Sequence, residues 1–211
     1  MKLTTKIKQL ALILSALPLA AMAGEMGTIY TQVGTNGVGL GYAKSVTDTI
    51  ALRAQINALN MSFTGDVGDF GSASKLDVNL SMGSVQVVGD WYPTDGGLRL
   101  SGGLVFNNNK ITVKGVGSVN GKSATVDAEV KMSDGVAPYL GVGYSTRPKD
   151  AKGLGFNFDL GAMFQNPKAT LAATGPGVTA ADVETQRLKV QEAADKLKVM
   201  PVNAVGVSYS F

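Results

Sequence analysis

The chain has 211 residues, among them 27 glycines, and contains neither cysteine nor histidine. This length is enough for one domain. Without cysteine there is no disulfide framework, no thiol nucleophile and no thiolate metal site. Without histidine the chain lacks the commonest general base, so hydrolytic triads that use histidine are excluded. We therefore predict no enzyme activity, no cofactor and no metal site.

The first 23 residues are predicted to be a secretory signal peptide. Three lysines lie within the first eight residues, an apolar run follows over residues 10–19, and the triplet Ala21-Met22-Ala23 precedes Gly24. A basic start, a short apolar stretch and a small-x-small site together are typical of a cleaved signal. We place cleavage between Ala23 and Gly24, which leaves 24–211 as the mature domain. The alternative is a buried N-terminal helix.

Removal of the signal changes the charge of the chain. The full sequence carries a formal charge of +3, and all of its 16 acidic residues follow Ala23. Three of the 19 basic residues belong to the signal, so 16 remain and the mature chain is close to neutral. The basic character therefore gives no support to a nucleic-acid partner.

Apolar and polar residues alternate with period two through most of the mature chain. Between residues 154 and 165, one face carries leucine and phenylalanine while the other carries Asn157, Asp159, Gly161 and Gln165. Segments of about ten such residues are typical of membrane β-strands. No apolar stretch after the signal is long enough for a transmembrane helix, and a closed barrel is the other structure that satisfies the backbone in lipid. A soluble sandwich also alternates, but the signal, the glycine-rich second face and the C-terminus favour the membrane.

We predict an all-β fold, a transmembrane antiparallel up-and-down β-barrel of eight strands. The strands are expected at 27–33, 37–44, 49–59, 76–92, 98–110, 135–146, 154–166 and 201–211. The short turns 45–48, 93–97 and 147–153 should face the periplasm, and the long connections 60–75, 111–134 and 167–200 should face outside. Residues 27–44 also fit a single bent strand. A change of phase at Gly83 suggests a β-bulge.

Residues 179–198 read as a helix before the last strand. Acidic and basic residues interleave along it, and its apolar stripe is loose. Two hypotheses remain open. The helix is either a solvated part of the last outer loop or a plug over the barrel mouth.

The chain ends in Val205-Gly206-Val207-Ser208-Tyr209-Ser210-Phe211, with every second residue apolar. This end resembles the C-terminal strand of bacterial outer-membrane proteins. The resemblance implies that Tyr209 and Phe211 are read by the barrel-assembly machinery. The segments 39–42, 90–93 and 138–144 are similar to strands of small eight-stranded barrels of the outer membrane protein A, X and W types. The resemblance implies location in the bacterial outer membrane, with the lipid bilayer as partner; we expect a monomer. The helical segment departs from that pattern.

The alternation places a set of polar side chains inside the predicted barrel. The set comprises Arg53, Gln55, Asp77, Asn79, Asp90, Arg99, Asn157 and Asp159. The interior of an eight-stranded barrel is only just wide enough for its own side chains. These residues are therefore predicted either to pair as an internal network, since buried charges need partners, or to line a narrow selective pathway.

Two functions remain open from the sequence. The first is a narrow channel or uptake protein for small solutes, favoured by the fold and the charged lumen. The alternative is a structural or adhesin-like barrel that acts through its long outer connections, which are longer than connections usually run. The fold alone does not decide between them.

Overall fold

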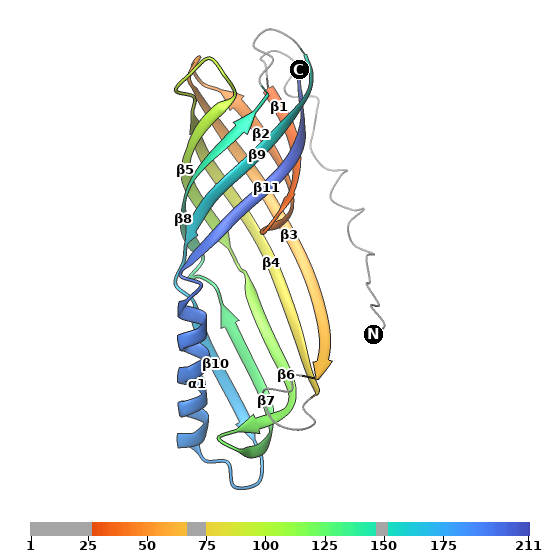
Figure 1. Ribbon diagram of the computed structural model, residues 1–211, viewed down its shortest axis with the longest axis vertical. Helices are drawn as coiled ribbons and strands as arrows, with labels where there is room; N and C mark the ends of the chain where they lie inside the picture. Colours follow the sequence, from red (N-terminus) through yellow and green to blue (C-terminus); the bar gives the residue numbers. More distant parts are fainter. Residues whose placement is uncertain (1–26, 67–74, 147–151) are drawn as a thin grey trace.

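The computed structural model describes residues 27–66, 75–146 and 152–211 (Figure 1). The predicted signal peptide with its cleavage site lies outside the described residues, as do parts of the predicted connections 60–75 and 147–153. The described part contains eleven strands and one helix. They are β1 (Gly27–Gly34), β2 (Gly37–Ser45), β3 (Ile50–Asp66), β4 (Lys75–Trp91), β5 (Leu98–Asn107), β6 (Lys110–Val119), β7 (Lys122–Lys131), β8 (Val136–Ser145), β9 (Gly153–Phe164), β10 (Lys168–Thr174), α1 (Ala180–Asp195) and β11 (Val199–Ser210).

Eight of these strands form a closed antiparallel barrel, which confirms the predicted fold class. Going round the wall the order is β1, β2, β3, β4, β5, β8, β9 and β11, and β11 pairs with β1 to close it. At the closure the backbone of Phe211 donates to and accepts from Gly27, at N···O distances of 3.1 and 3.3 Å. Residues 27–44 form two strands. The turn between them includes Gly37, whose φ of +92° suits glycine.

The long connections form a folded extension of the barrel wall instead of loops. β6 pairs with the far half of β4, β7 pairs with β6, and β10 pairs with β7. Together with the far half of β3, these strands make a five-stranded sheet (Figure 1). A tight turn at Asn120 and Gly121, both with positive φ, joins β6 to β7. We call this sheet with α1 the extension. We call the opposite end of the barrel, where the turns 46–49 and 92–97 lie, the turn end.

The predicted β-bulge at Gly83 is wrong. The β3–β4 register runs without a break from Ile50↔Trp91 to Asp66↔Lys75. The faces themselves change chemistry along the strand. The exterior face of β4 carries Val85 and Val87 in the barrel but Asn79 and Ser81 in the extension. The interior face changes in the opposite sense, because in the extension it packs as an apolar layer. The apparent phase change therefore marks the outer edge of the barrel's apolar belt.

The helix α1 lies beside β10 on the extension and does not cross the barrel mouth, so the plug hypothesis is wrong (Figure 1). Gln191 covers the edge of β10. Its Oε1 accepts from the backbone N of Ala169 at 2.8 Å, and its Nε2 donates to the carbonyl of Pro167 at 2.9 Å. Among the described residues, no helix is long and apolar enough to cross a membrane.

The first turn of α1 is fixed by a capping box between Thr179 and Asp182. The Asp182 carboxylate also accepts from Lys122 Nζ and from Asn120 Nδ2, both at 2.7 Å. These hydrogen bonds, with that from Lys122 the strongest, hold the pKa of Asp182 well below its usual range. Asp182 therefore ties the helix to the β6–β7 turn.

We expect Asp182→Asn to loosen α1 while the barrel stays intact. Because the folded-state pKa of Asp182 is lowered, its contribution is complete above about pH 4 and is lost as the pH falls through the folded-state value. Hydrogen exchange of residues 179–198 should rise in the variant at neutral pH. It should rise in the native chain only in acid. Glu192→Gln on the same helix is the control, and equal protection in Asp182→Asn and the native chain would contradict the prediction.

Candidate functional site

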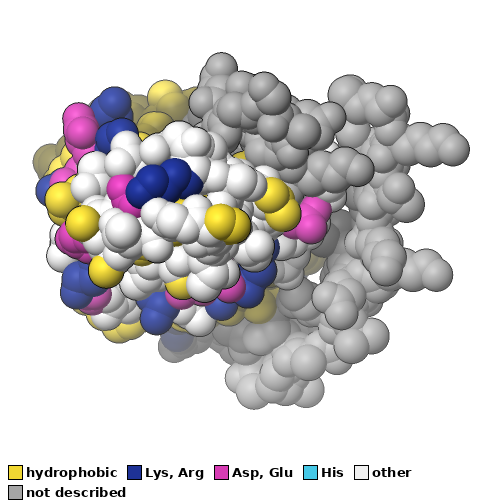
Figure 2. Space-filling model, turned by 90° about the horizontal axis from the view of Figure 1, so that it is seen from below, with side chains coloured by type: hydrophobic (Ala, Val, Ile, Leu, Met, Phe, Trp, Pro, Cys, Tyr) yellow, Lys and Arg dark blue, Asp and Glu magenta, His cyan; other side chains and the backbone are white. Residues whose placement is uncertain are grey.

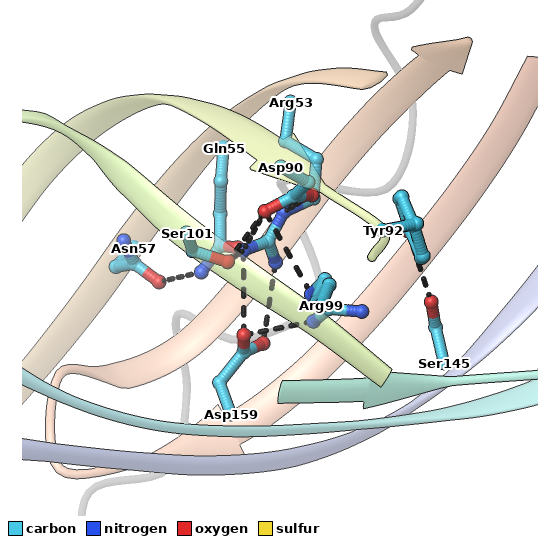
Figure 3. Close-up of polar contacts among 9 residues, drawn as sticks. All are labelled: Arg53, Gln55, Asn57, Asp90, Tyr92, Arg99, Ser101, Ser145 and Asp159. Carbon is cyan, nitrogen blue, oxygen red and sulfur yellow. Dashed lines mark hydrogen bonds and ion pairs between the residues drawn. The ribbon is translucent and has the colours of Figure 1, made fainter. Parts of the chain in front are cut away.

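Four charged side chains meet in the lumen of the barrel (Figure 3). They are Arg53 from β3, Asp90 from β4, Arg99 from β5 and Asp159 from β9. Each is at most 7% exposed. Every second residue of a barrel strand points inward, so strands far apart in the sequence deliver these side chains to one level. We call these four residues the charged network.

Each arginine of the network contacts both aspartates. Arg53 Nε lies 2.6 Å from an Asp90 oxygen, and its Nη1 lies 3.2 Å from an Asp159 oxygen. Arg99 Nη2 lies 2.8 Å from Asp159, and its Nε lies 3.7 Å from Asp90. Ser101 adds a hydroxyl that donates to Asp90 at 2.6 Å. Two positive and two negative groups thus balance inside a low-dielectric lumen, as buried charges require.

Neutral polar groups flank the network. The Gln55 side-chain amide donates to Asn57 (Figure 3). Asn57 in turn donates from Nδ2 to Ser84 Oγ at 3.1 Å. The Tyr30 ring lies against the Arg53 guanidinium, with 5.8 Å between the ring centre and Cζ, within range of a cation–π contact.

The structure places six of the eight predicted lumen residues in the lumen: Arg53, Gln55, Asp90, Arg99, Asn157 and Asp159. Asp77 was wrongly predicted to lie there. It belongs to the extension, where Thr64 Oγ1 donates to it at 2.7 Å on the exterior face. Asn79, hydrogen-bonded to Ser62, lies on that same face. Both errors have one cause. The prediction places the polar face of the strand inside the barrel on both sides of Gly83, whereas beyond Gly83 the interior face is apolar and the exterior face is polar.

A cavity of about 400 Å³ lies between the charged network and the turn end. We call it the vestibule. Arg53 and Arg99 form its floor, and turn residues such as Asp48 and Asp95 lie at its mouth. Its walls are rich in hydroxyl groups, from Thr28, Ser45, Thr47, Tyr92, Ser145, Thr146, Ser208 and Ser210. Asn157 also lines it, and its buried Oδ1 has no hydrogen-bond partner among the described residues.

The lumen on the other side of the network is filled. It holds a buried apolar cluster, made of Val88, Val105, Ala137, Tyr139, Met163 and Val202. Buried neutral polar side chains, among them Gln86 and Asn107, lie beside this cluster. The Tyr139 ring lies over Gly141 and Gly161, where any side chain would collide with it. The cavity next to the network on this side has a volume of about 10 Å³, room for about one water molecule. The lumen is therefore closed in this structure.

The sequence analysis missed this apolar cluster. Its members share the inward parity of the charged residues: Val88 lies two positions from Asp90, and Met163 lies four from Asp159. Parity alone could have found them. The sequence prediction assigns only polar side chains to the inward face, as in water-filled barrels, although a narrow lumen can also be filled by apolar side chains.

No family model and no curated protein sequence matches the chain. Chains of solved structures do match, and two of them match over almost their full length. The crystal structure of Acinetobacter baumannii CarO has a TM-score of 0.60 and 23% identity, covering 88% of this chain and 97% of its own. That of Acinetobacter baumannii CarO2 has a TM-score of 0.64 and 20% identity, covering 89% and 99%.

The barrel has the fold of the two CarO structures. At this level of identity the likeness concerns the fold and transfers no residue roles. The match takes in most of each chain. In the part of this chain that the structure describes, no group of three or more acidic side chains is placed to hold a metal ion.

Proposed function

We propose that the barrel spans the bacterial outer membrane with the turn end in the periplasm and the extension outside the cell. The exterior of the barrel supports this. Leu154 and Phe156 are 84% and 69% exposed, in a belt of apolar side chains that soluble monomers rarely present to water. The belt ends at Ala58 and Gly83, where the exterior turns polar. Short turns at one end and longer connections at the other follow the usual orientation of such barrels.

Membrane location is tested by refolding the mature chain into lipid vesicles. A closed barrel resists detergent until heated, so unboiled and boiled samples should migrate differently in a gel, and the barrel should resist protease outside the extension. Identical migration of both samples would contradict the proposed location. In keeping with that location, Tyr209 and Phe211 remain our candidates for recognition by the barrel-assembly machinery, and we expect a monomer.

We further propose that the barrel takes up small polar solutes through a lumen that is closed at rest. The observation that carries this is the position of the charged network, which lies between the open vestibule and the buried apolar cluster. In the filled half of the lumen, the apolar cluster and the neutral polar side chains beside it close the barrel without any charged group. Four buried charges cost desolvation energy that such packing avoids. Their place at the floor of a 400 Å³ vestibule therefore favours a role toward a solute, as in selectivity filters lined by charged side chains.

Solute flux tests this proposal directly. Liposomes that contain the mature protein should swell in small polar solutes and should exclude solutes of disaccharide size and larger. Planar bilayers should show brief openings from a closed baseline. Liposomes that carry correctly folded barrel but behave like protein-free liposomes with every small solute would overturn the uptake function.

A second candidate function is recognition of a partner by the extension. It is favoured by the far half of β3, which pairs with β4 on one side and has no strand on its other edge among the described residues. Met61 and Phe63 are 40% and 51% exposed on the same segment. An unprotected edge with apolar side chains is a ready surface for pairing with another chain. Removal of the extension strands would abolish such binding without affecting flux.

A further inference from the structure

A row of three lysines crosses the exterior of the extension just beyond the apolar belt. Lys110 on β6 lies directly opposite Lys131 on β7, and Lys131 lies directly opposite Lys168 on β10. We call these three residues the lysine row. Directly opposed side chains in a sheet lie about 5 Å apart, and like charges at such positions destabilise the pairing. The row therefore has a cost that the sheet itself does not explain.

The two outer lysines have carboxylate partners and the middle one does not. Lys110 Nζ lies 3.6 Å from Glu129, and Lys168 Nζ lies 2.8 Å from Asp134. Lys131 is exposed and has no ion-pair partner among the described residues. The row keeps a net positive charge after these pairs are counted, and its centre is free to bind an anion.

The distance of the lysine row from the apolar belt indicates which kind of anion it meets. The strands β6, β7 and β10 stand over β5, β8 and β9 in the same order. Lys110 follows the exposed Phe106 by four residues, and Lys168 follows the exposed Phe164 by four. Four extended residues rise about 13 Å, and less along the membrane normal because barrel strands tilt. A lysine side chain can bend back toward the lipid, so its ammonium reaches the headgroup layer above the belt.

The lysine row does not continue onto β4 and β3. At the same level on β3 and β4 the exterior positions hold Asn60, Ser62, Asn79 and Ser81, which are neutral. The tip of the extension is mixed as well. Seen from that end, Figure 2 shows basic and acidic side chains interspersed over the visible face. A general attraction to an anionic surface would not need a row in register on three adjacent strands.

We propose that the lysine row binds the phosphate groups of a phosphorylated glycolipid in the outer leaflet. The three ammonium groups span two strand spacings, about 10 Å, and present point charges that suit phosphate oxygens. The acyl chains of the same lipid lie against the apolar belt of β5, β8 and β9 below. The bound lipid would thus cover the exterior of β5, β8 and β9, directly below β6, β7 and β10. The site rests on the membrane location proposed above and not on the uptake function.

Native mass spectrometry of the detergent-solubilised mature protein tests this site with two probes, lipid A carrying two phosphates and the same lipid without phosphates. We expect the wild type to prefer the phosphorylated lipid. A lysine near an anionic lipid surface contributes about 1 kcal/mol, which is about fivefold in affinity. The variant Lys110→Gln/Lys131→Gln/Lys168→Gln should therefore lose the preference by about tenfold or more.

The matched control Lys114→Gln/Arg187→Gln/Lys189→Gln removes the same charge from places on the extension that lie farther from the barrel rim. It should bind the phosphorylated lipid like the wild type. Lys131→Gln breaks no ion pair and should weaken binding about fivefold, which keeps the test valid if the triple variant does not fold. Equal binding of both lipids by the wild type, or an equal loss in the control, would overturn the site. Failure of the wild type to form a heat-modifiable barrel would instead refute the membrane location.

Discussion

Replacing Arg53 with alanine is expected to lower the free energy of unfolding of the barrel by about 3–5 kcal/mol. The change leaves the carboxylates of Asp90 and Asp159 buried with one arginine between them, where two had balanced them. A buried charge that loses its partner keeps its desolvation cost and loses the attraction that offset it. Urea unfolding of the barrel refolded in vesicles, followed by tryptophan fluorescence, measures the loss. Arg99→Ala should act in the same direction.

Two control variants separate burial from charge. Lys114 lies 2.6 Å from Asp127, but both side chains are more than half exposed, so Lys114→Ala should cost less than about 1 kcal/mol. The double variant Arg53→Met/Asp90→Asn removes one charge of each sign and leaves Arg99 with Asp159. It should recover much of the stability that Arg53→Ala loses. Unchanged unfolding in both Arg53→Ala and Arg99→Ala would show that the network does not stabilise the barrel.

Shortening Tyr139 and Met163 together to alanine is expected to turn the closed lumen into a conducting one. Both side chains are at most 2% exposed and belong to the apolar cluster that fills the lumen beyond the network. Their removal would join the vestibule to the extension side through water-filled space beside the network. Single-channel recordings in planar bilayers should show a several-fold longer open time and a larger conductance than those of the wild type.

The control for this experiment removes similar side chains from the exterior. Leu140 and Phe164 lie on the same two strands but are 60% and 41% exposed on the apolar belt. Leu140→Ala/Phe164→Ala should leave the conductance unchanged. If the Tyr139→Ala/Met163→Ala barrel is folded and its recordings match those of the wild type, the apolar cluster is not the barrier. The closure would then be assigned to the charged network alone.

The barrel could be predicted from the sequence because each of its strands and turns is specified by residues close together in the chain. Alternation along 154–165, turn residues such as those at 93–97 and the apolar C-terminal strand each specify a strand or a turn within about ten residues. The inward parity of Arg53 and Arg99 followed from the same alternation. Their pairing with both Asp90 and Asp159 did not, because it depends on which strands lie across the lumen from one another.

The extension could not be predicted for a related reason. The strands Lys110–Val119 and Lys122–Lys131 are each ten residues long, as β5 and β8 are, but their alternation is weak and they therefore read as loop. They become strands because the far half of β4 offers them an unpaired edge. The inversion of polarity at Gly83 was visible in the sequence, but a β-bulge explained it as well as a change of surroundings did. Only the continuous register of β3 with β4 decides between the two explanations.

That continuous register has a mechanical consequence. The two 17-residue strands β3 and β4 form one ribbon. Its ladder of hydrogen bonds runs from the extension into the barrel wall without interruption. Arg53 and Asp90 lie near one end of this ribbon, and Phe63 lies near the other. A movement of the extension relative to the rim of the barrel would therefore be transmitted along this ribbon to the barrel wall. A bend imposed on the extension must either break ladder bonds or change the separation between these two network residues and those on the opposite wall.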